Sequence, residues 1–278
     1  MIRCASILVA ATLALQPPAF HSGVEVVTVD VSVTRADAPV AGLTADDFVV
    51  TDNGVRQRID TVTAAQVPLS LTLVLDTSAS VAGERLDSLV EASERAVNEL
   101  RPNDYVSLIT FSSGVARPVA LTRNFESVRS ALHAIAGYGN TTMRDALFLA
   151  LRATAPDTTR PLLLVFTDGL DTSSWLSEDD LLESVHRANA VVHAITVGPY
   201  QPFLRQVTHD AGGRTWSASS NRDLQELFRR AIRDMRDRYV LTFTPSGVSR
   251  PGWHALSVKL SRTHGDVLAR PGYWVGSR

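Results

Sequence analysis

Beyond its first twenty residues, the chain begins with a clear alternation of hydrophobic and polar positions. Residues 25–34 have the sequence EVVTVDVSVT, in which the valines from position 27 onward take every second place. Successive side chains of a strand point to opposite faces, so this segment predicts a strand with one buried face. Residues 48–50 and 56–62 predict two more strands, because the Asp-Asn-Gly sequence between them favours a tight hairpin. The pattern predicts a small N-terminal β unit over residues 22–66.

The pattern changes at Pro68. Leu69–Asp76 (LSLTLVLD) is almost continuously apolar and ends in an acid, which is typical of a parallel strand covered by helices on both faces. From there to residue 236, helical spacing alternates with short apolar runs. Helices are predicted over residues 83–100, 125–135, 143–154, 178–189, 203–210 and 222–236, and strands over residues 105–111, 115–121, 162–167, 191–197 and 214–217. This order predicts a doubly wound α/β domain with a mostly parallel sheet over residues 67–237.

From residue 238 the helical pattern stops. Residues 239–245, 253–261 and 266–275 predict three more short strands, separated by Pro-Gly and His-Gly turns. Such strands need partners to bury one face, and so do the strands at the other end of the chain. We therefore expect residues 238–278 to form a C-terminal β unit that pairs with the N-terminal unit as a small β-sandwich beside the α/β domain.

Residues 1–21 have the anatomy of a signal peptide. One positive charge, Arg3, precedes an apolar run over residues 6–15, which is followed by Gln-Pro-Pro. The run is too short to span a bilayer. The alternative is an ordinary buried strand or helix at the terminus. The signal peptide predicts a secreted or periplasmic protein with no transmembrane span, and its removal would take away Cys4, the single cysteine.

Composition narrows the possible functions. The formal net charge is only −2, so no overall field favours nucleic acid or an anionic membrane surface. With Lys259 as the single lysine, no phosphate-binding G-x-x-x-x-G-K-[ST] loop can exist, and there is no G-x-S-x-G elbow. The histidines show no metal-binding spacing. We therefore expect a binding protein and not an enzyme.

Three polar clusters fall at the carboxyl ends of the strands of the predicted sheet, where loops converge. They are Asp76-Thr77-Ser78-Ala79-Ser80, Gly139-Asn140-Thr141-Thr142 and Thr167-Asp168-Gly169. In an open α/β sheet, loops at the carboxyl ends of the strands converge, and ligands bind there. Two carboxylates and three hydroxyls form an all-oxygen set, which suits Mg²⁺, with Mn²⁺ or Ca²⁺ as alternatives. Zinc would instead favour histidine or cysteine.

These clusters resemble the metal-binding motifs of von Willebrand factor type A domains. Asp76 to Ser80 (DTSAS) matches the D-x-S-x-S motif of that family, and the other two clusters match its threonine loop and its T-D-G sequence, in the same order. The resemblance implies a metal site formed by Asp76, Ser78, Ser80, Thr141 and Asp168. Asn140 and Ala79 occupy positions where the family often has glycine. The flanking segments resemble a bacterial subgroup of secreted proteins related to this family.

Three hydroxyl ligands leave much of a divalent ion's charge uncompensated, so an acidic group from outside can complete the coordination shell. Together with the resemblance, this predicts an adhesion or scaffold module that binds a carboxylate of a protein partner through the ion. One alternative is a metal-assisted hydrolase, for which Asp171 is the evident candidate base. Another is a structural envelope protein in which the ion is incidental.

Other polar and aromatic residues have simpler interpretations. We expect Asp145 to order a loop near the ion, and Asp171 to be a solvated loop acid. The arginines at 229, 230, 233, 236 and 238 alternate with acids, which predicts a solvated, ion-paired helix face. Trp253, Tyr273 and Trp274 are expected to pack the terminal β unit, and the alternative is an exposed aromatic patch.

Overall fold

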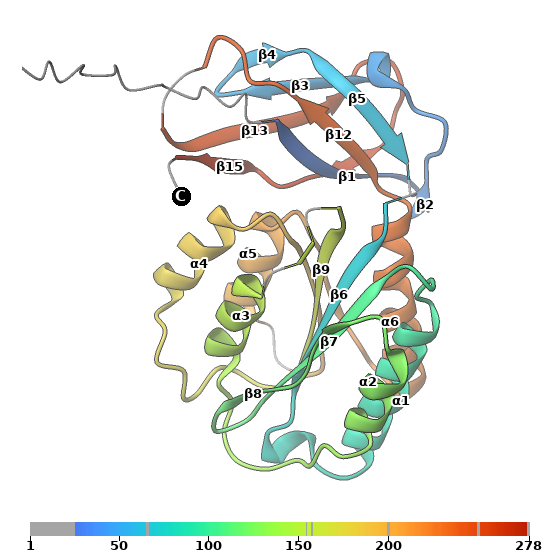
Figure 1. Ribbon diagram of the computed structural model, residues 1–278, viewed down its shortest axis with the longest axis vertical. Coiled ribbons are helices and arrows are strands. Elements are labelled where there is room, and N and C mark those ends of the chain that lie inside the picture. Colours follow the sequence, from blue (N-terminus) through green and yellow to red (C-terminus); the bar gives the residue numbers. More distant parts are fainter. Residues whose placement is uncertain are drawn as a thin grey trace, which may run out of the picture.

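The computed structural model describes residues 26–64, 67–153, 155–156, 158–198, 201–248 and 251–276. The predicted signal peptide lies outside these described residues. The described chain forms an α/β domain and a β-sandwich built from both ends of the chain (Figure 1).

The α/β domain contains a six-stranded sheet in the order β11-β10-β9-β6-β7-β8. Its strands, in chain order, are β6 (Leu69–Asp76), β7 (Tyr105–Phe111), β8 (Val115–Thr122), β9 (Arg160–Thr167), β10 (Val191–Thr196) and β11 (Thr215–Ser217). Neighbouring strands pair in parallel except β8, which is antiparallel to β7 at one edge. The prediction of a doubly wound, mostly parallel sheet is confirmed.

Helices cover both faces of this sheet (Figure 1). One layer contains α1 (Glu84–Asn98), α2 (Phe125–Leu132) and α6 (Asn221–Arg236), and the other contains α3 (Met143–Arg152), α4 (Glu178–Arg187) and α5 (Pro202–Asp210). Successive side chains of β6 point to opposite faces of the sheet, so the strand packs against both helix layers. Leu71 and Leu73 face the first layer, whereas Val74 faces the second. Among the described residues, no helix is long and apolar enough to cross a membrane.

The β-sandwich has two antiparallel sheets. One has the order β14-β1-β12-β5, with β2 beside β1, and the other has the order β15-β13-β3-β4. Its strands are β1 (Val27–Arg35), β2 (Ala38–Pro39), β3 (Phe48–Asp52), β4 (Val55–Gln57), β5 (Ile59–Ala64), β12 (Tyr239–Phe243), β13 (Gly252–Leu260), β14 (Asp266–Leu268) and β15 (Gly272–Val275). The valines at alternate positions of β1 are buried in its core, as predicted. The two ends of the chain therefore share one core.

Two segments predicted as single strands are each divided between the two sheets. Residues 56–62 split into β4, which pairs with β3, and β5, which pairs with β12. Residues 266–275 split into β14, which pairs with β1, and β15, which pairs with β13. A sandwich closes its core where the chain crosses from one sheet to the other, and alternation along the sequence does not reveal such a crossing.

The arginine-rich end of α6 is ion-paired as predicted, but it is not wholly solvated. Arg236 pairs with the buried Asp104, and Arg238 pairs with Asp234 at 2.8 Å with its own side chain fully buried. Arg229, Arg230 and Arg233 form the more exposed ion pairs. The prediction of a solvated face was wrong for Arg236 and Arg238, because the sandwich and the loop before β7 cover this end of the helix.

The sandwich packs against the end of the α/β domain where α6 passes directly into β12 (Figure 1). Arg160 at the start of β9 donates to Asp30 of β1 at 2.6 Å. Arg270 donates to the carbonyls of His186 and Ala188 at the end of α4, at 2.9 Å each. Trp253 packs on the His186 ring, so it lies between the two parts and not inside the sandwich as predicted. The carboxyl ends of the parallel strands are left free at the far end.

Candidate metal centre

Asp76 and Asp168 lie side by side at the free end of the sheet. Asp76 is the last residue of β6 and Asp168 directly follows β9, and the two strands are neighbours in a register that pairs Leu75 with Phe166. Asp76 is fully buried and the Asp168 side chain is only 2% exposed. Two carboxylates are therefore held together with little access to bulk water.

The carboxylate of Asp76 is fixed by hydrogen bonds on both oxygens. The Ser78 amide donates to one oxygen at 2.9 Å, and the Thr167 hydroxyl donates to the other at 2.7 Å. Burial raises the pKa of Asp76 above its ordinary value, and the nearby negative charge of Asp168 adds to the rise, while the hydrogen bonds oppose it. A cation between the two acids would remove this electrostatic cost.

The two predicted serine ligands connect the first loop to Asp168. The hydroxyls of Ser78 and Ser80 are 3.1 Å apart, and the Ser80 hydroxyl donates to the Asp168 carboxylate at 2.7 Å. Ser78 is buried and has extended backbone geometry before the short turn Ala79–Val81. This turn brings both hydroxyls to the side of the loop that faces the acids.

Thr141 reaches the same place from the loop before α3. A side-chain carbon built on Gly169 would lie 3.9 Å from the Thr141 hydroxyl oxygen, so Thr141 sits against the residue that follows Asp168. The amide of Ala79 donates to the carbonyl of Gly139 at 3.0 Å, which ties the first loop to the threonine loop. All five residues predicted from the sequence therefore gather at one end of the sheet.

Arg85 is a member of this cluster that the sequence did not reveal. Its guanidinium forms an ion pair with the Asp168 oxygen that Ser80 does not contact, and it also donates to the Ser80 carbonyl at 3.3 Å. Arg85 lies in the first turn of α1, with its side chain 43% exposed. A basic residue near the start of a helix gives no signal for such a role, because most such residues are solvated.

The two other acids near the site order the loop after β9. Asp145 accepts from the amides of Trp175 and Leu176 at 3.0 and 2.9 Å, in agreement with the prediction of a loop-ordering role. Asp171 was predicted to be a solvated acid, and this was wrong. Its side chain is only 8% exposed and accepts from Arg144 and from the Ser174 hydroxyl.

The donor chemistry fits a hard divalent cation. The cluster offers two carboxylates and three hydroxyls and contains neither histidine nor cysteine, so it suits magnesium better than zinc. Across the part of the chain that the structure describes, no group of three or more His, Cys, Asp or Glu side chains could hold a metal by itself. Arg85 already places a positive group against Asp168, which is a second indication that the acids favour a cation.

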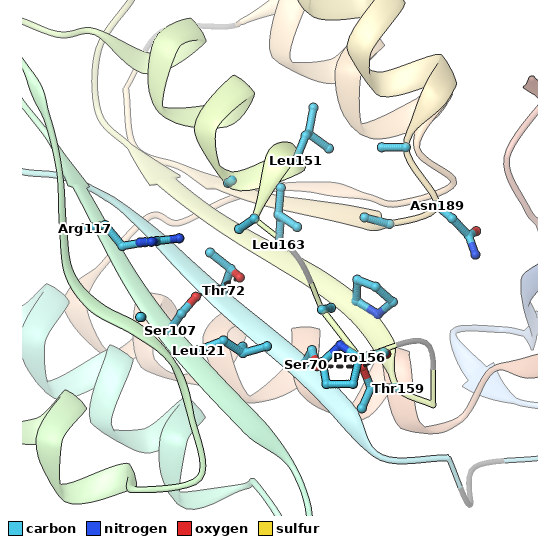
Figure 2. A pocket seen from close by; sticks show the side chains of 17 residues that line it. Ser70, Thr72, Ser107, Arg117, Leu121, Leu151, Pro156, Thr159, Leu163 and Asn189 are labelled. Atoms are coloured by element: carbon cyan, nitrogen blue, oxygen red, sulfur yellow. Dashed lines mark hydrogen bonds between the residues drawn. The ribbon is translucent and has the colours of Figure 1, made fainter. Parts of the chain in front are cut away.

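A separate cavity of about 500 Å³ lies on the sheet face beside α3, away from the candidate metal site. Figure 2 shows Arg117 on one side of it, Asn189 on the other, and Thr72, Ser107 and Leu163 along the sheet between them. The residues that line it include one arginine and no acid. It therefore cannot supply the carboxylates that a magnesium ion requires.

Comparison with known proteins agrees with this geometry. Residues 71–170, which include all five candidate ligands, match the family model of the von Willebrand factor type A domain. This chain carries a von Willebrand factor type A domain. The domain is similar to inter-alpha-trypsin inhibitor heavy chain H3 of Mesocricetus auratus, with 25% identity over 135 residues, and to heavy chain H4 of Bos taurus, with 25% identity over 142 residues. Those matches cover 44% and 46% of this chain but only 15% and 16% of the relatives.

Solved structures share the fold at low sequence identity. A von Willebrand factor type A protein from Catenulispora acidiphila superposes with a TM-score of 0.58 at 15% identity, covering 87% of this chain and 75% of that one. The protein BatB from Bacteroides thetaiotaomicron superposes with a TM-score of 0.51 at 18% identity, covering 60% of this chain and 98% of that one. Von Willebrand factor type A domains commonly mediate interactions between proteins.

Proposed function

We propose that this protein is a non-enzymatic, extracytoplasmic binding module of the adhesion or scaffold type. In this proposal Asp76, Ser78, Ser80, Thr141 and Asp168 hold a Mg²⁺ ion, directly or through water. The ion accepts a carboxylate from a partner protein. Mn²⁺ or Ca²⁺ would serve the same role if the ligand distances suit them.

One observation carries the proposal: two buried carboxylates lie together at the free end of the sheet with the predicted serine hydroxyls bonded into the same cluster. A bound ion would neutralise the two acids, and the five side chains would leave one position of an octahedral Mg²⁺ shell open to an oxygen of an external acid. The protein's own groups fix where that charge lies. Asp76 is held by Ser78 and Thr167, and Asp168 is held by Ser80.

For the alternative of a metal-assisted hydrolase, the candidate base is Asp171. It accepts from the Arg144 amide at 2.8 Å and from the Ser174 hydroxyl at 2.6 Å, so these donors would compete with a water for its oxygens. No geometry at the site favours hydrolysis over binding. We therefore do not propose a second function.

Location outside the cytoplasm is part of the proposal and depends on the leader-like residues 1–21. Expression of the full chain with an epitope tag at its C-terminus would test it. The proposal predicts that a shorter, processed protein is found in the periplasm or medium. An unprocessed protein confined to the cytoplasm would contradict it.

The binding role is tested by affinity capture from an envelope fraction, with and without a chelator. Wild-type protein, Asp168→Ala and the control Asp179→Ala, an exposed acid on α4, would be compared. We expect the same specific partner with wild type and with the control, lost on chelation and lost with Asp168→Ala. Capture that survives chelation and Asp168→Ala equally would instead support the structural role in which the ion is incidental.

A further inference from the structure

The three most exposed large hydrophobic side chains of the described residues lie on the loops that carry or adjoin the candidate metal centre. Trp175 is 97% exposed, Tyr138 is 63% exposed and Leu170 is 55% exposed. Tyr138 directly precedes the threonine loop, Leu170 lies two residues after Asp168, and Trp175 lies in the same loop as Leu170. We call these three residues the apolar rim.

The exposure of Trp175 comes from a well-fixed backbone. Its amide donates to Asp145 at 3.0 Å, and the next amide in the chain donates to the other oxygen of the same carboxylate at 2.9 Å. On the preceding side, the amide and hydroxyl of Ser174 both donate to Asp171, which is paired with Arg144. The loop is thus tied to α3 on both sides of the indole, and the indole is held outward.

Hydrogen bonds also fix the backbone at or next to the other two rim residues. The amide of Tyr138 donates to the carbonyl of Thr77 at 2.8 Å, in the loop between Asp76 and Ser78. Leu170 follows Gly169, whose carbonyl accepts from the Gln201 side chain at 2.8 Å. Large apolar side chains on a fixed backbone around a polar centre lose little conformational freedom when a partner covers them.

We propose that the apolar rim is a docking surface for an extended segment of a partner protein in which aromatic or aliphatic residues flank an acidic residue. This inference rests on the proposed function, because the ion would place the acid. The flanking side chains would then lie on Trp175 and on Leu170 or Tyr138. The rim determines which acidic segments bind, since a carboxylate by itself is common to all protein surfaces.

The charges around the centre favour this occupant over a lipid surface. In a loaded site the two acids balance the ion, which keeps one open coordination position, and Arg85, once displaced from Asp168, adds a positive charge at the same edge. An acidic centre flanked by apolar residues complements this arrangement of a cationic centre and apolar surroundings. A phosphatidylcholine bilayer would match the apolar rim but offers no carboxylate to the ion.

Selection from a library of short peptides tests the inference. Each peptide carries one fixed aspartate flanked on both sides by randomised residues, and selection is carried out on the full chain in the presence of Mg²⁺. We expect enrichment of aromatic and aliphatic residues within about four positions of the aspartate. For a selected peptide, Trp175→Ala should weaken binding by about tenfold or more, as for an aromatic hot spot.

Control variants separate the rim from the ion. Val55→Ser removes an exposed apolar side chain from the sandwich and should leave peptide binding unchanged. Trp175→Phe should restore part of the affinity lost in Trp175→Ala. Calorimetric Mg²⁺ affinity should be the same in wild type and Trp175→Ala, because the indole is not one of the proposed ligands of the ion.

Distinct results would overturn the two claims. If aspartate-dependent peptides bind with no preference at the flanking positions, and Trp175→Ala changes nothing, the rim is not a docking surface although the proposed function stands. If binding needs neither the aspartate nor Mg²⁺, the proposed function itself fails. Concentration-dependent dimerisation of wild type in sedimentation, or binding to phosphatidylcholine vesicles, that is lost in Trp175→Ala would assign the rim to self-association or to a membrane.

Discussion

The guanidinium of Arg85 lies against the carboxylate of Asp168, on the oxygen that the Ser80 hydroxyl leaves free. A positive group that belongs to the protein therefore occupies part of the position where a metal ion would compensate the same acid. In the proposed metal-bound form, Arg85 is the side chain that would have to move. Because the Asp168 side chain is buried and that of Arg85 is 43% exposed, the arginine can turn out to solvent while the acid stays in place.

This contact predicts that Arg85→Ala raises the affinity for Mg²⁺. The variant removes a cation that competes for Asp168, and a partly exposed ion pair contributes up to about 1 kcal/mol, so we expect an increase of about two- to fivefold in calorimetric titration. Arg129→Ala, which removes an ion-paired arginine from α2, is the matched control and should bind as wild type. Equal or weaker Mg²⁺ binding by Arg85→Ala would show that Arg85 does not compete with the ion.

The burial of His193 leads us to expect that the protein loses stability in mild acid. Its ring is fully buried in β10, where Nδ1 accepts from the Arg214 amide at 3.0 Å and Nε2 lies 3.1 Å from Asp234. Protonation of Nδ1 would remove that acceptor and place a third positive charge beside Arg214 and Arg238. Burial lowers the pKa of His193 despite the favourable charge of Asp234.

The direction of the pH effect follows from this shift. The native state stays neutral at His193 while the unfolded chain takes up a proton near pH 6.5, so stability is highest above that value and falls as the pH drops below it. Between pH 7 and pH 5 the free energy of unfolding should decrease by up to about 2 kcal/mol from this group. His193→Gln should flatten this part of the profile in urea unfolding, whereas His133→Gln, an exposed control, should retain it. A profile unaffected by His193→Gln would contradict this explanation.

Because Arg236 pairs with the buried Asp104, we expect its replacement to lower the free energy of unfolding much more than replacement of Arg230 in the same helix. Asp104 is fully buried and also accepts from the Leu69 amide at 2.8 Å, so it fixes the start of β6. Arg236→Ala leaves this carboxylate without its cation and should lower the free energy of unfolding by about 3 kcal/mol. Arg230→Ala, which breaks an exposed pair with Asp37, should cost less than about 1 kcal/mol. Similar losses in the two variants would show that burial does not decide the contribution here.

The elements that the sequence predicted well are those in which one local pattern determines the structure. β6 and β7 have the predicted bounds, because nearly continuous apolar runs leave few alternatives for a central parallel strand. The splits at residues 56–62 and 266–275 could not be predicted. Both halves of each segment keep a strand pattern, and only the packing of two sheets decides where the chain crosses between them.

At the candidate site, too, residues in local sequence motifs could be predicted, whereas contacts that depend on the packing of distant elements could not. Asp76, Ser78, Ser80 and Asp168 could be grouped in advance, because the ends of neighbouring parallel strands meet. Thr141, in the loop between α2 and α3, was grouped with them by the resemblance to the family motifs. The contact of Arg85 with Asp168 and the burial of Asp171 depend on how α1 and α3 pack over the loops, and neither residue stands in a distinctive local pattern. The exposure of Trp175 could not be predicted from the sequence either, since a tryptophan side chain is more often buried than exposed.

The most direct test of the account is calorimetric titration of Mg²⁺ into chelator-treated wild type, Asp76→Ala, Ser78→Ala and the control Asp179→Ala. We expect wild type and the control to bind one ion per chain with similar affinity. Asp76→Ala should show no binding, and Ser78→Ala should bind more weakly than wild type. Failure of the wild-type protein to bind Mg²⁺, Mn²⁺ or Ca²⁺, or equal binding by wild type and Asp76→Ala, would contradict the assignment of these residues as a metal centre.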